Sequence, residues 1–362
     1  MSKELCRSFN KKSRLMRGFL LVAVLAVLLA SCSGEKSDLV TLAGEAQGST
    51  FSIKYRDPQQ RDLSMLVDST LKVIDQSLSL WVEGSTVNAF NQADTTFTSK
   101  DSHFRIMVAR SEQLWNETEG AFDPTVLPLV KAWGLGKEGR EALDTLAVDS
   151  IRRFVGMDRM AMDEDWRERP VTPPVITYRK TYPEVNFDPN GIAQGYTVDV
   201  LAQLLEAHGI SDYMVEVGGE VRARGLNDRG KVWTIQIDKQ VEGEQHVEQI
   251  VVPLADRSLA TSGNYRKFIE VEGKRYGHTI DPRTGRPAMN SLLSASIIAD
   301  DCATADALAT AMLVLGLAEA QLWLRHNRGV EAYLIMDEGQ GDYTVWSTPG
   351  WPVLEAQPIS PK

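Results

Sequence analysis

Apolar residues follow two periods along this chain, and these predict its helices and strands. Phe51, Ile53 and Tyr55 alternate with polar residues, which predicts a strand inside Leu42–Arg56. Helical spacing or helix-forming composition marks four other ranges: Asp62–Ser77, Phe104–Glu117, Tyr196–His208 and Ala303–Leu317. Gly120 and Gly209 end the second and third of these helices.

Short apolar runs in the second half of the chain predict further strands. They span Tyr213–Ala223, Val232–Asp238, Val247–Val252, Leu292–Ala299, Ala332–Met336 and Tyr343–Trp346. The pair Gly218-Gly219 interrupts the first of them, which indicates a bulge or the close approach of a ligand to the backbone. Residues 137–175 are charged and punctuated by proline, with a short helix near Leu143–Phe154, and we interpret them as a peripheral insertion. Because helices and strands do not alternate strictly, the predicted fold class is α+β, a mostly antiparallel sheet flanked by helices.

The N-terminal 31 residues have the pattern of a targeting segment. A basic stretch precedes an apolar run, Phe19–Leu29, which is short for a helix that crosses a bilayer. The next residues end in Ala30-Ser31-Cys32 and resemble the lipobox of bacterial lipoproteins, in which cleavage precedes an acylated cysteine. We therefore expect a signal peptide at 1–31, lipid on Cys32, and anchoring to a bacterial membrane on its extracytoplasmic side. An uncleaved anchor helix and a plain signal peptide are the alternatives.

Charge and cysteine content narrow the function classes. Removal of residues 1–31 takes away six basic residues and Glu4, so the net charge moves from −10 to −15. Such an acidic domain is not expected to bind nucleic acid or anionic lipid head groups. Of the three cysteines, Cys6 leaves with the signal and Cys32 carries lipid, so no intrachain disulfide can form. Cys302 is then expected to be a small buried apolar residue at the start of a helix.

A candidate cation site lies in the range Ala303–Leu317. Asp306 and Thr310 are four residues apart there, so they share one helix face. Two hard oxygen donors suit Mg²⁺, which keeps open positions for water and substrate phosphate. The alternative is that the Thr310 hydroxyl bonds to the carbonyl of Asp306, with Asp306 in a solvated first turn.

Three loops carry further candidate chemistry. A glycine-bearing loop, Phe187–Tyr196, opens a helix, and unpaired N–H groups at such a helix start attract anions. Thr261-Ser262-Gly263 has the composition of a small-residue turn with two hydroxyls. His278 directly precedes a rigid acidic turn that ends at Asp281-Pro282. No Walker A lysine loop is present, so we expect the neutralisation of a phosphate ligand to fall on a metal ion.

Six segments together resemble the ApbE family of FAD:protein FMN transferases over roughly residues 45–345. In order they are TEGAFDPTVLPLVKAWGLG (118–136), NFDPNGIAQGYTVD (186–199), VEVGGEVRARG (215–225), SLATSGNYRKF (258–268), GHTIDPRTGRP (277–287) and TADALATAMLVLG (304–316). The resemblance implies a T-fold-related architecture. The expected domains are a tether at 32–41, a flavin transferase domain at 42–350 and a C-terminal tail at 351–362.

The resemblance also implies the residues that contact FAD. They are Gln47, Trp81, Ala121, Phe122, Asp123, Asp188, Gln194 and Ile280. Gln47 stands where the family commonly has methionine, and Trp81 stands where the family has an aromatic residue over the flavin ring. Two alternatives involve no ligand: Trp81 is a core residue, or Phe122 is core while Asp123 caps a helix that begins at Pro124.

The implied reaction needs a cation and a base. The cation is Mg²⁺, or Mn²⁺ in its place, held by Asp306, Thr310 and the backbone carbonyl of Gly191. His278 takes the proton of a Thr or Ser hydroxyl on a partner protein or orients the phosphate, and the hydroxyl oxygen attacks the FMN phosphorus and releases AMP. The alternative is that His278 is a surface turn residue hydrogen-bonded to Asp281. Asp301 is a weaker candidate for the base, and Thr261, Ser262 and Arg283 are candidates for contact with phosphate or partner.

The sequence leaves other functions open. With water as the nucleophile, the same site is an FAD pyrophosphatase that yields FMN and AMP. Without turnover, the protein is a lipid-tethered flavin-binding protein. The expected partners are FAD, a target that is flavinylated on Thr or Ser, of the kind found in membrane electron-transport complexes, and the membrane itself; homodimerisation is left open.

Overall fold

A computed structural model describes residues 38–134, 145–164, 175–238, 249–263, 268–271, 274–277, 279–339 and 342–352. The chain divides into two units, Met1–Asp38 and Leu39–Lys362, and every described helix and strand belongs to the second. The predicted signal peptide, Cys32, His278 and the tail from residue 353 lie outside the described residues.

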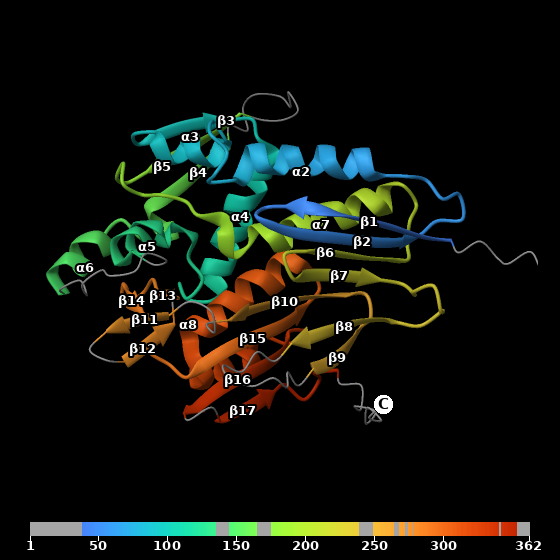
Figure 1. Cartoon of the computed structure of the whole chain (residues 1–362). Coiled ribbons are helices and arrows are strands. Elements are labelled where there is room, and N and C mark those ends of the chain that lie inside the picture. Colours follow the sequence, from blue (N-terminus) through green and yellow to red (C-terminus); the bar gives the residue numbers. More distant parts are fainter. Residues whose placement is uncertain are drawn as a thin grey trace, which may run out of the picture. The chain divides into compact units, whose positions relative to one another are not determined.

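Eight strands form one antiparallel sheet in the order β1-β2-β6-β7-β10-β15-β16-β17 (Figure 1). They are β1 Leu39–Ala46, β2 Ser49–Arg56, β6 Tyr213–Val217, β7 Glu220–Arg224, β10 Arg257–Gly263, β15 Leu292–Ala299, β16 Glu331–Gly339 and β17 Asp342–Ser347. Every neighbouring pair is antiparallel, so the predicted α+β class with a mostly antiparallel sheet is confirmed. Strand β1 begins at Leu39, three residues before the predicted start of the domain.

Two long helices cover one face of this sheet. Helix α7 (Ala193–Ala207) packs on β6 and β7, and α8 (Cys302–His326) packs on β10 and β15. The two helices also pack against each other. Apolar residues of β2 and β6 and of α7 share one buried cluster with Cys302, as predicted for a small apolar residue at a helix start. The opposite face is covered by the hairpin of β8 (Trp233–Asp238) and β9 (Gln249–Leu254).

The other helices lie outside the α7–α8 layer or around it (Figure 1). They are α2 Ser64–Leu78, α3 Thr86–Gln92, α4 Ser102–Glu117, α5 Leu127–Trp133 and α6 Thr145–Arg152, with short 3₁₀ turns η1 Pro124–Val126, η2 Met157–Arg159 and η3 Pro189–Gly191. The remaining strands form small sheets: β3 Thr96–Ser99, β5 Ile176–Lys180 and β4 Met160–Glu164; β11 Phe268–Val271 with β12 Lys274–Gly277; and β13 Ile280–Asp281 with β14 Arg286–Pro287.

Three sequence predictions need correction. Residues 137–175 are not wholly peripheral, because β4 pairs with β5 and Met160 is buried in the main core. The pair Gly218-Gly219 forms the turn of the β6–β7 hairpin, with φ of 71° and 113°, and not a bulge within one strand. The segment Thr261-Ser262-Gly263 is no turn but the end of β10, where Gly263 pairs with Ser294 of β15.

Helix α8 is long and strongly apolar. By length and composition it is the one helix in the described part of the chain that could cross a membrane, and more than half of its apolar window is buried inside the domain. Gly316 has φ 72° and ψ 173°, which kinks the helix after its fourth turn, and Asn290 packs against this kink. The apolar surface of α8 is therefore explained by its place in the protein core.

Candidate active site

Side chains from α7 fix the start of α8. The Asp199 carboxylate accepts hydrogen bonds from the N–H groups of Cys302 (3.0 Å) and Ala303 (2.9 Å), and it forms an ion pair with Arg222 at 2.7 Å. Asp301 caps the helix by accepting from the Thr304 N–H at 2.9 Å. These contacts satisfy the free N–H groups of the first turn, so the next turn, which carries Asp306, is held firmly against α7. Asp301 is thereby engaged as a cap and paired with Arg110.

Asp306 lies at the junction of α7 and α8. Its Oδ2 atom accepts a hydrogen bond of 3.0 Å from the Gly195 N–H, and only 6% of the residue is exposed. A solvated first turn, the alternative weighed for Asp306, is therefore wrong. Burial raises the pKa of Asp306 to about 7, because an ionised carboxyl with one N–H partner is poorly solvated there.

Thr310 faces two other oxygen-bearing groups. Its Oγ1 atom lies 3.2 Å from Ser262 Oγ on β10. A Cβ atom built on Gly191 would lie 3.5 Å from the same Thr310 oxygen, so the 191 backbone passes close to α8. The structure thus brings Gly191, Asp306 and Thr310 to one place, with Ser262 beside them. Carboxylate, hydroxyl and carbonyl oxygens are the donors that Mg²⁺ prefers, and a buried carboxylate without a cationic partner fits a bound ion.

A second carboxylate in this region was not predicted. Glu220, the first residue of β7, is 7% exposed, and its Oε2 atom has no hydrogen-bond partner among the described residues. Burial, together with the nearby charge of Asp306, raises the pKa of Glu220 well above its ordinary value. No local sequence signal marked Glu220, because its burial and direction follow from the β6–β7 pairing.

A pocket of about 170 Å³ opens beside the Gly191 loop. It is lined by Gln47, Trp81 and Gln194, three of the predicted FAD contacts, together with Asp75, Leu78, Ser79, Asn190 and Ala193. Trp81 is 78% exposed, so the alternative of a core tryptophan is wrong. An exposed indole at a pocket rim is available to stack on a planar ligand.

Each glutamine of this pocket lies at a hairpin turn of the large sheet. Gln47 is in the β1–β2 turn with φ 52°, and its Nε2 donates to Thr197 Oγ1 at 2.7 Å. Gln194 packs over the β6–β7 turn so closely that a Cβ on Gly218 would lie 2.3 Å from its Nε2. The group that approaches Gly218 closely is thus a protein side chain, Gln194, whereas the sequence indicated a ligand.

The profile of the ApbE family matches residues 47–334. The chain belongs to the ApbE family. A FAD:protein FMN transferase of Vibrio cholerae is 36% identical over 310 residues, which is 83% of this chain and 88% of that protein. The corresponding protein of Haemophilus influenzae is 33% identical, over 91% of this chain and 95% of its own length.

Solved structures of the ApbE family share the fold. The flavin transferase ApbE from Vibrio cholerae superimposes with a TM-score of 0.74 at 32% identity, covering 87% of this chain and 98% of that one. The flavinyl transferase ApbE of Pseudomonas stutzeri, in its apo form, gives 0.75 at 31% identity, covering 86% of this chain and 95% of that one. The ApbE-like architecture predicted from the ordered segments is thus confirmed.

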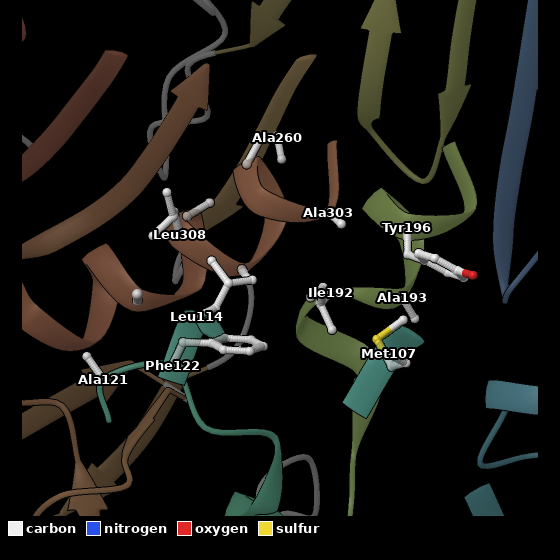
Figure 2. Close-up of a cluster of buried hydrophobic side chains, with 14 of the residues drawn as sticks. Met107, Leu114, Ala121, Phe122, Ile192, Ala193, Tyr196, Ala260, Ala303 and Leu308 are labelled. Carbon is white, nitrogen blue, oxygen red and sulfur yellow. The ribbon is translucent and has the colours of Figure 1, made fainter. Parts of the chain in front are cut away.

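The remaining positions implied by the ApbE resemblance lie around the core behind the site. Phe122 is buried, and its ring is 3.5 Å from a Cβ built on Gly191. Figure 2 shows the apolar cluster that contains Ala121, Phe122 and Ile192, with contributions from α4, α7 and α8. Asp188 caps η3 by accepting a hydrogen bond from the Asn190 N–H at 3.0 Å, which fixes the start of the turn that carries Gly191.

Asp123 has a structural role in this family member. Its Oδ1 accepts from the Thr125 N–H (2.7 Å) and Oγ1 (2.5 Å), and its Oδ2 accepts from Trp115 Nε1 at 3.0 Å. The alternative in which Phe122 is core and Asp123 caps the turn at Pro124 therefore describes both side chains correctly. Burial raises the pKa of Asp123 to about 6.

Asp123 also lines a second, larger pocket of about 580 Å³. Arg283 lies in its wall, with its guanidinium bound to Asp281 and Glu319. Ile280 is apart from the flavin-side pocket, because its side chain packs in a small apolar cluster with Leu129, Trp133, Val148 and Val155. The structure therefore places the predicted ApbE site residues in three main groups. Gly191, Asp306 and Thr310 offer oxygen donors for a cation, and Gln47, Trp81 and Gln194 line the flavin-side pocket. Ala121, Phe122 and Asp123 are buried.

Proposed function

We propose that this protein is an FAD:protein FMN transferase that depends on a divalent ion. The observation that carries the proposal is the contiguity of two features: the pocket rimmed by Trp81 and the oxygen donors of Gly191, Asp306 and Thr310. The loop 189–195 joins them, because Asn190, Ala193 and Gln194 line the pocket while Gly191 faces Thr310. The family membership and the activity for which its relatives are named support the same conclusion.

The chain itself would orient FAD at this site. The exposed Trp81 indole offers a face to the isoalloxazine ring, a contact comparable to aromatic stacking on a nucleic-acid base. Gln47 and Gln194 supply amide groups at the pocket wall. Ala193 and Gln194, the first two residues of α7, line the pocket, and backbone N–H groups at a helix start favour the phosphate groups next to the flavin.

Gly191, Asp306 and Thr310 would hold the ion, Mg²⁺ or Mn²⁺. When bound, such an ion neutralises diphosphate charge and polarises the bonds at phosphorus. Among the described residues there is no group of three or more His, Cys, Asp or Glu side chains that could hold a metal. In the proposed set, the Gly191 carbonyl and the Thr310 hydroxyl stand beside the Asp306 carboxylate.

The transfer step moves the FMN half of FAD, through its phosphorus, from AMP to the partner. The hydroxyl oxygen of a Thr or Ser in the partner forms a bond to the phosphorus of the FMN half, and the bond from that phosphorus to the bridging oxygen breaks. AMP leaves with the bridging oxygen, and FMN stays on the partner as a phosphoester. His278, which lies outside the described residues, is the proposed acceptor of the hydroxyl proton.

The deciding experiment offers the protein FAD, Mg²⁺ and a flavinylatable electron-transport subunit. We expect yellow fluorescence that stays with the subunit through SDS gel electrophoresis, and none when EDTA replaces Mg²⁺. Free FMN and AMP without labelled subunit would identify an FAD pyrophosphatase instead. Bound but unchanged FAD would identify a flavin-binding protein without turnover.

We also propose that Cys32 carries lipid and holds the domain at the extracytoplasmic side of a bacterial membrane. The support is the basic stretch, the short apolar run and the Ala-Ser-Cys ending of the first 32 residues. Metabolic labelling with an alkyne palmitate should mark the wild-type protein. A Cys32→Ser variant should lose both the label and membrane fractionation.

A further inference from the structure

Glu220 is a buried carboxyl group without a compensating partner. Only 7% of the residue is exposed, and its Oε2 atom forms no hydrogen bond within the described residues. Of the ion pairs found among the described residues, none includes it. A carboxylate in that position costs several kcal/mol unless a cation or donors surround it. A buried polar group left in this state calls for a specific explanation, such as a bound ion, an ordered water or a catalytic role.

The direction of the Glu220 side chain follows from the register of the β6–β7 hairpin. Glu220 pairs with Val217, and paired residues of an antiparallel ladder project to the same face. Val217 belongs to the cluster shared with α7 and Cys302, so Glu220 points to the face that α7 and α8 cover. Glu216 pairs with Val221, which belongs to the cluster of the opposite face.

Helix α8 contacts β7 beside Glu220 through Cys302, which is one helical turn before Asp306. Cys302 Sγ lies 3.6 Å from the backbone carbonyl of Val221, the residue after Glu220. One helical turn later, Asp306 projects towards α7 and receives the Gly195 N–H. The two carboxyl groups are close enough for the charge on one to act on the other. Both therefore face the same buried space between β7, α7 and α8.

We propose that Glu220 is a second carboxylate of the divalent-cation site and that it helps Asp306 to hold the ion. A dication between two carboxylates removes the repulsion and supplies the missing partner of Glu220 Oε2. The set of donors is then two carboxylates, the Thr310 hydroxyl and the Gly191 carbonyl. This assignment rests on the ion of the proposed function but not on the transfer of FMN.

Metal titration without FAD tests the assignment. MgCl₂ and MnCl₂ are titrated calorimetrically into the full chain, into Glu220→Gln and into Glu216→Gln. Glu220→Gln keeps the size of the side chain and removes its charge, and we expect its Kd for both ions to rise at least about tenfold. Glu216→Gln removes the same charge from the opposite face of the same hairpin, and its Kd should stay within about twofold of the wild type.

Thermal melts separate an ion-binding role from a purely structural one. Without metal, Glu220→Gln should melt above the wild type, because it lacks one of two repelling buried carboxyl groups. On addition of Mg²⁺ its melting temperature should rise less than that of the wild type. A structural role predicts the reverse order without metal and equal gains with it. If Glu220→Gln yields no folded protein, Glu220→Asp carries the test and should bind the ions more weakly than the wild type.

The outcomes distinguish this assignment from the proposed function. Wild-type Kd values in Glu220→Gln, or no ion bound by the wild type, overturn the role of Glu220 even if the wild type flavinylates its partner. A tenfold loss in Glu220→Gln supports that role even if the wild type transfers no FMN. The transferase assay on the wild type is read separately for this reason.

Discussion

The N–H of Gly195 donates a hydrogen bond of 3.0 Å to Asp306 Oδ2 and so joins the first turn of α7 to the second turn of α8. The two helices are in contact at this point without room for a side chain. A Cβ on Gly195 would lie 2.3 Å from the Cys302 carbonyl oxygen and 2.8 Å from Asp306 Cβ. The position of the carboxylate that would bind the ion therefore depends on a glycine in another helix.

Gly195→Ala should destabilise the protein and displace Asp306. The added methyl overlaps backbone atoms that cannot rotate away, and overpacking of this kind costs at least about 2 kcal/mol. Urea unfolding measures the change, and Mg²⁺ titration measures the damage to the site. Gly230→Ala is the control, because it has open space and only a positive φ of 66°, which costs about 1 kcal/mol. Equal losses in both variants would contradict the close-contact explanation.

Asp306→Asn should abolish metal-dependent turnover while the fold survives. The asparagine Oδ1 can still accept the Gly195 N–H, so the α7–α8 junction is kept, but the charge is lost. We expect FMN transfer to fall by about 10²-fold or more, with a circular dichroism spectrum like that of the wild type. Asp300→Asn, which changes an exposed carboxylate two residues before α8, is the control. Full activity of Asp306→Asn would show that the ion binds elsewhere.

Trp81→Ala should weaken FAD binding and leave stability unchanged. Because the indole is 78% exposed, its removal opens no cavity, and the free energy of unfolding should move by less than about 0.5 kcal/mol. Loss of stacking is worth about 1–3 kcal/mol, so the Kd for FAD should rise at least about fivefold. Quenching of flavin fluorescence measures the Kd. Trp81→Phe should recover most of the affinity, and a large loss of stability in Trp81→Ala would contradict the exposed placement.

Asp123 should make the protein less stable as the pH rises from 4 to 7. Its pKa in the fold, about 6, is above the unfolded value of 3.8, so the folded state holds the proton more tightly. The stabilisation is complete below the unfolded pKa and is lost as pH rises through the folded pKa. Relative to Asp123→Asn, the wild type should lose about 2.5 kcal/mol of unfolding free energy over this range. A pH-independent difference between the two proteins would contradict the buried placement of the carboxyl group.

The sequence predicted the elements whose periodicity is strong and missed those set by pairing. The helix predicted at Ala303–Leu317 and the strand with Phe51, Ile53 and Tyr55 are present, because both bury one regular face. Strand β4 was missed because Met160–Glu164 lies in a charged segment and has meaning only beside β5. The Gly218-Gly219 turn was misjudged because a bulge and a two-residue hairpin have the same local composition, and only the partner strand separates them.

The residues of the candidate site also divide into those that the sequence predicted and those that only the assembled fold identifies. Spacing on one helix placed Asp306 and Thr310 together, and the family resemblance added Gly191 and the pocket glutamines. Glu220 could not be found in this way, since its value depends on the face to which β7 turns it and on the missing partner of its Oε2 atom. Both properties arise from the assembled sheet and have no signature within the Gly-Gly-Glu sequence.

Because α8 follows the other site residues in the chain, the two parts of the candidate site are synthesised at different times. Asp306 and Thr310 are contributed by the last helix, whereas Gly191, Trp81 and Gln47 all precede it by more than one hundred residues. The residues that line the flavin-side pocket are synthesised before α8, so under the proposed function a nascent chain has no complete cation site until α8 has emerged. Nascent or truncated chains that lack α8 are therefore expected to be inactive as transferases, with activity beginning only after α8 has been synthesised.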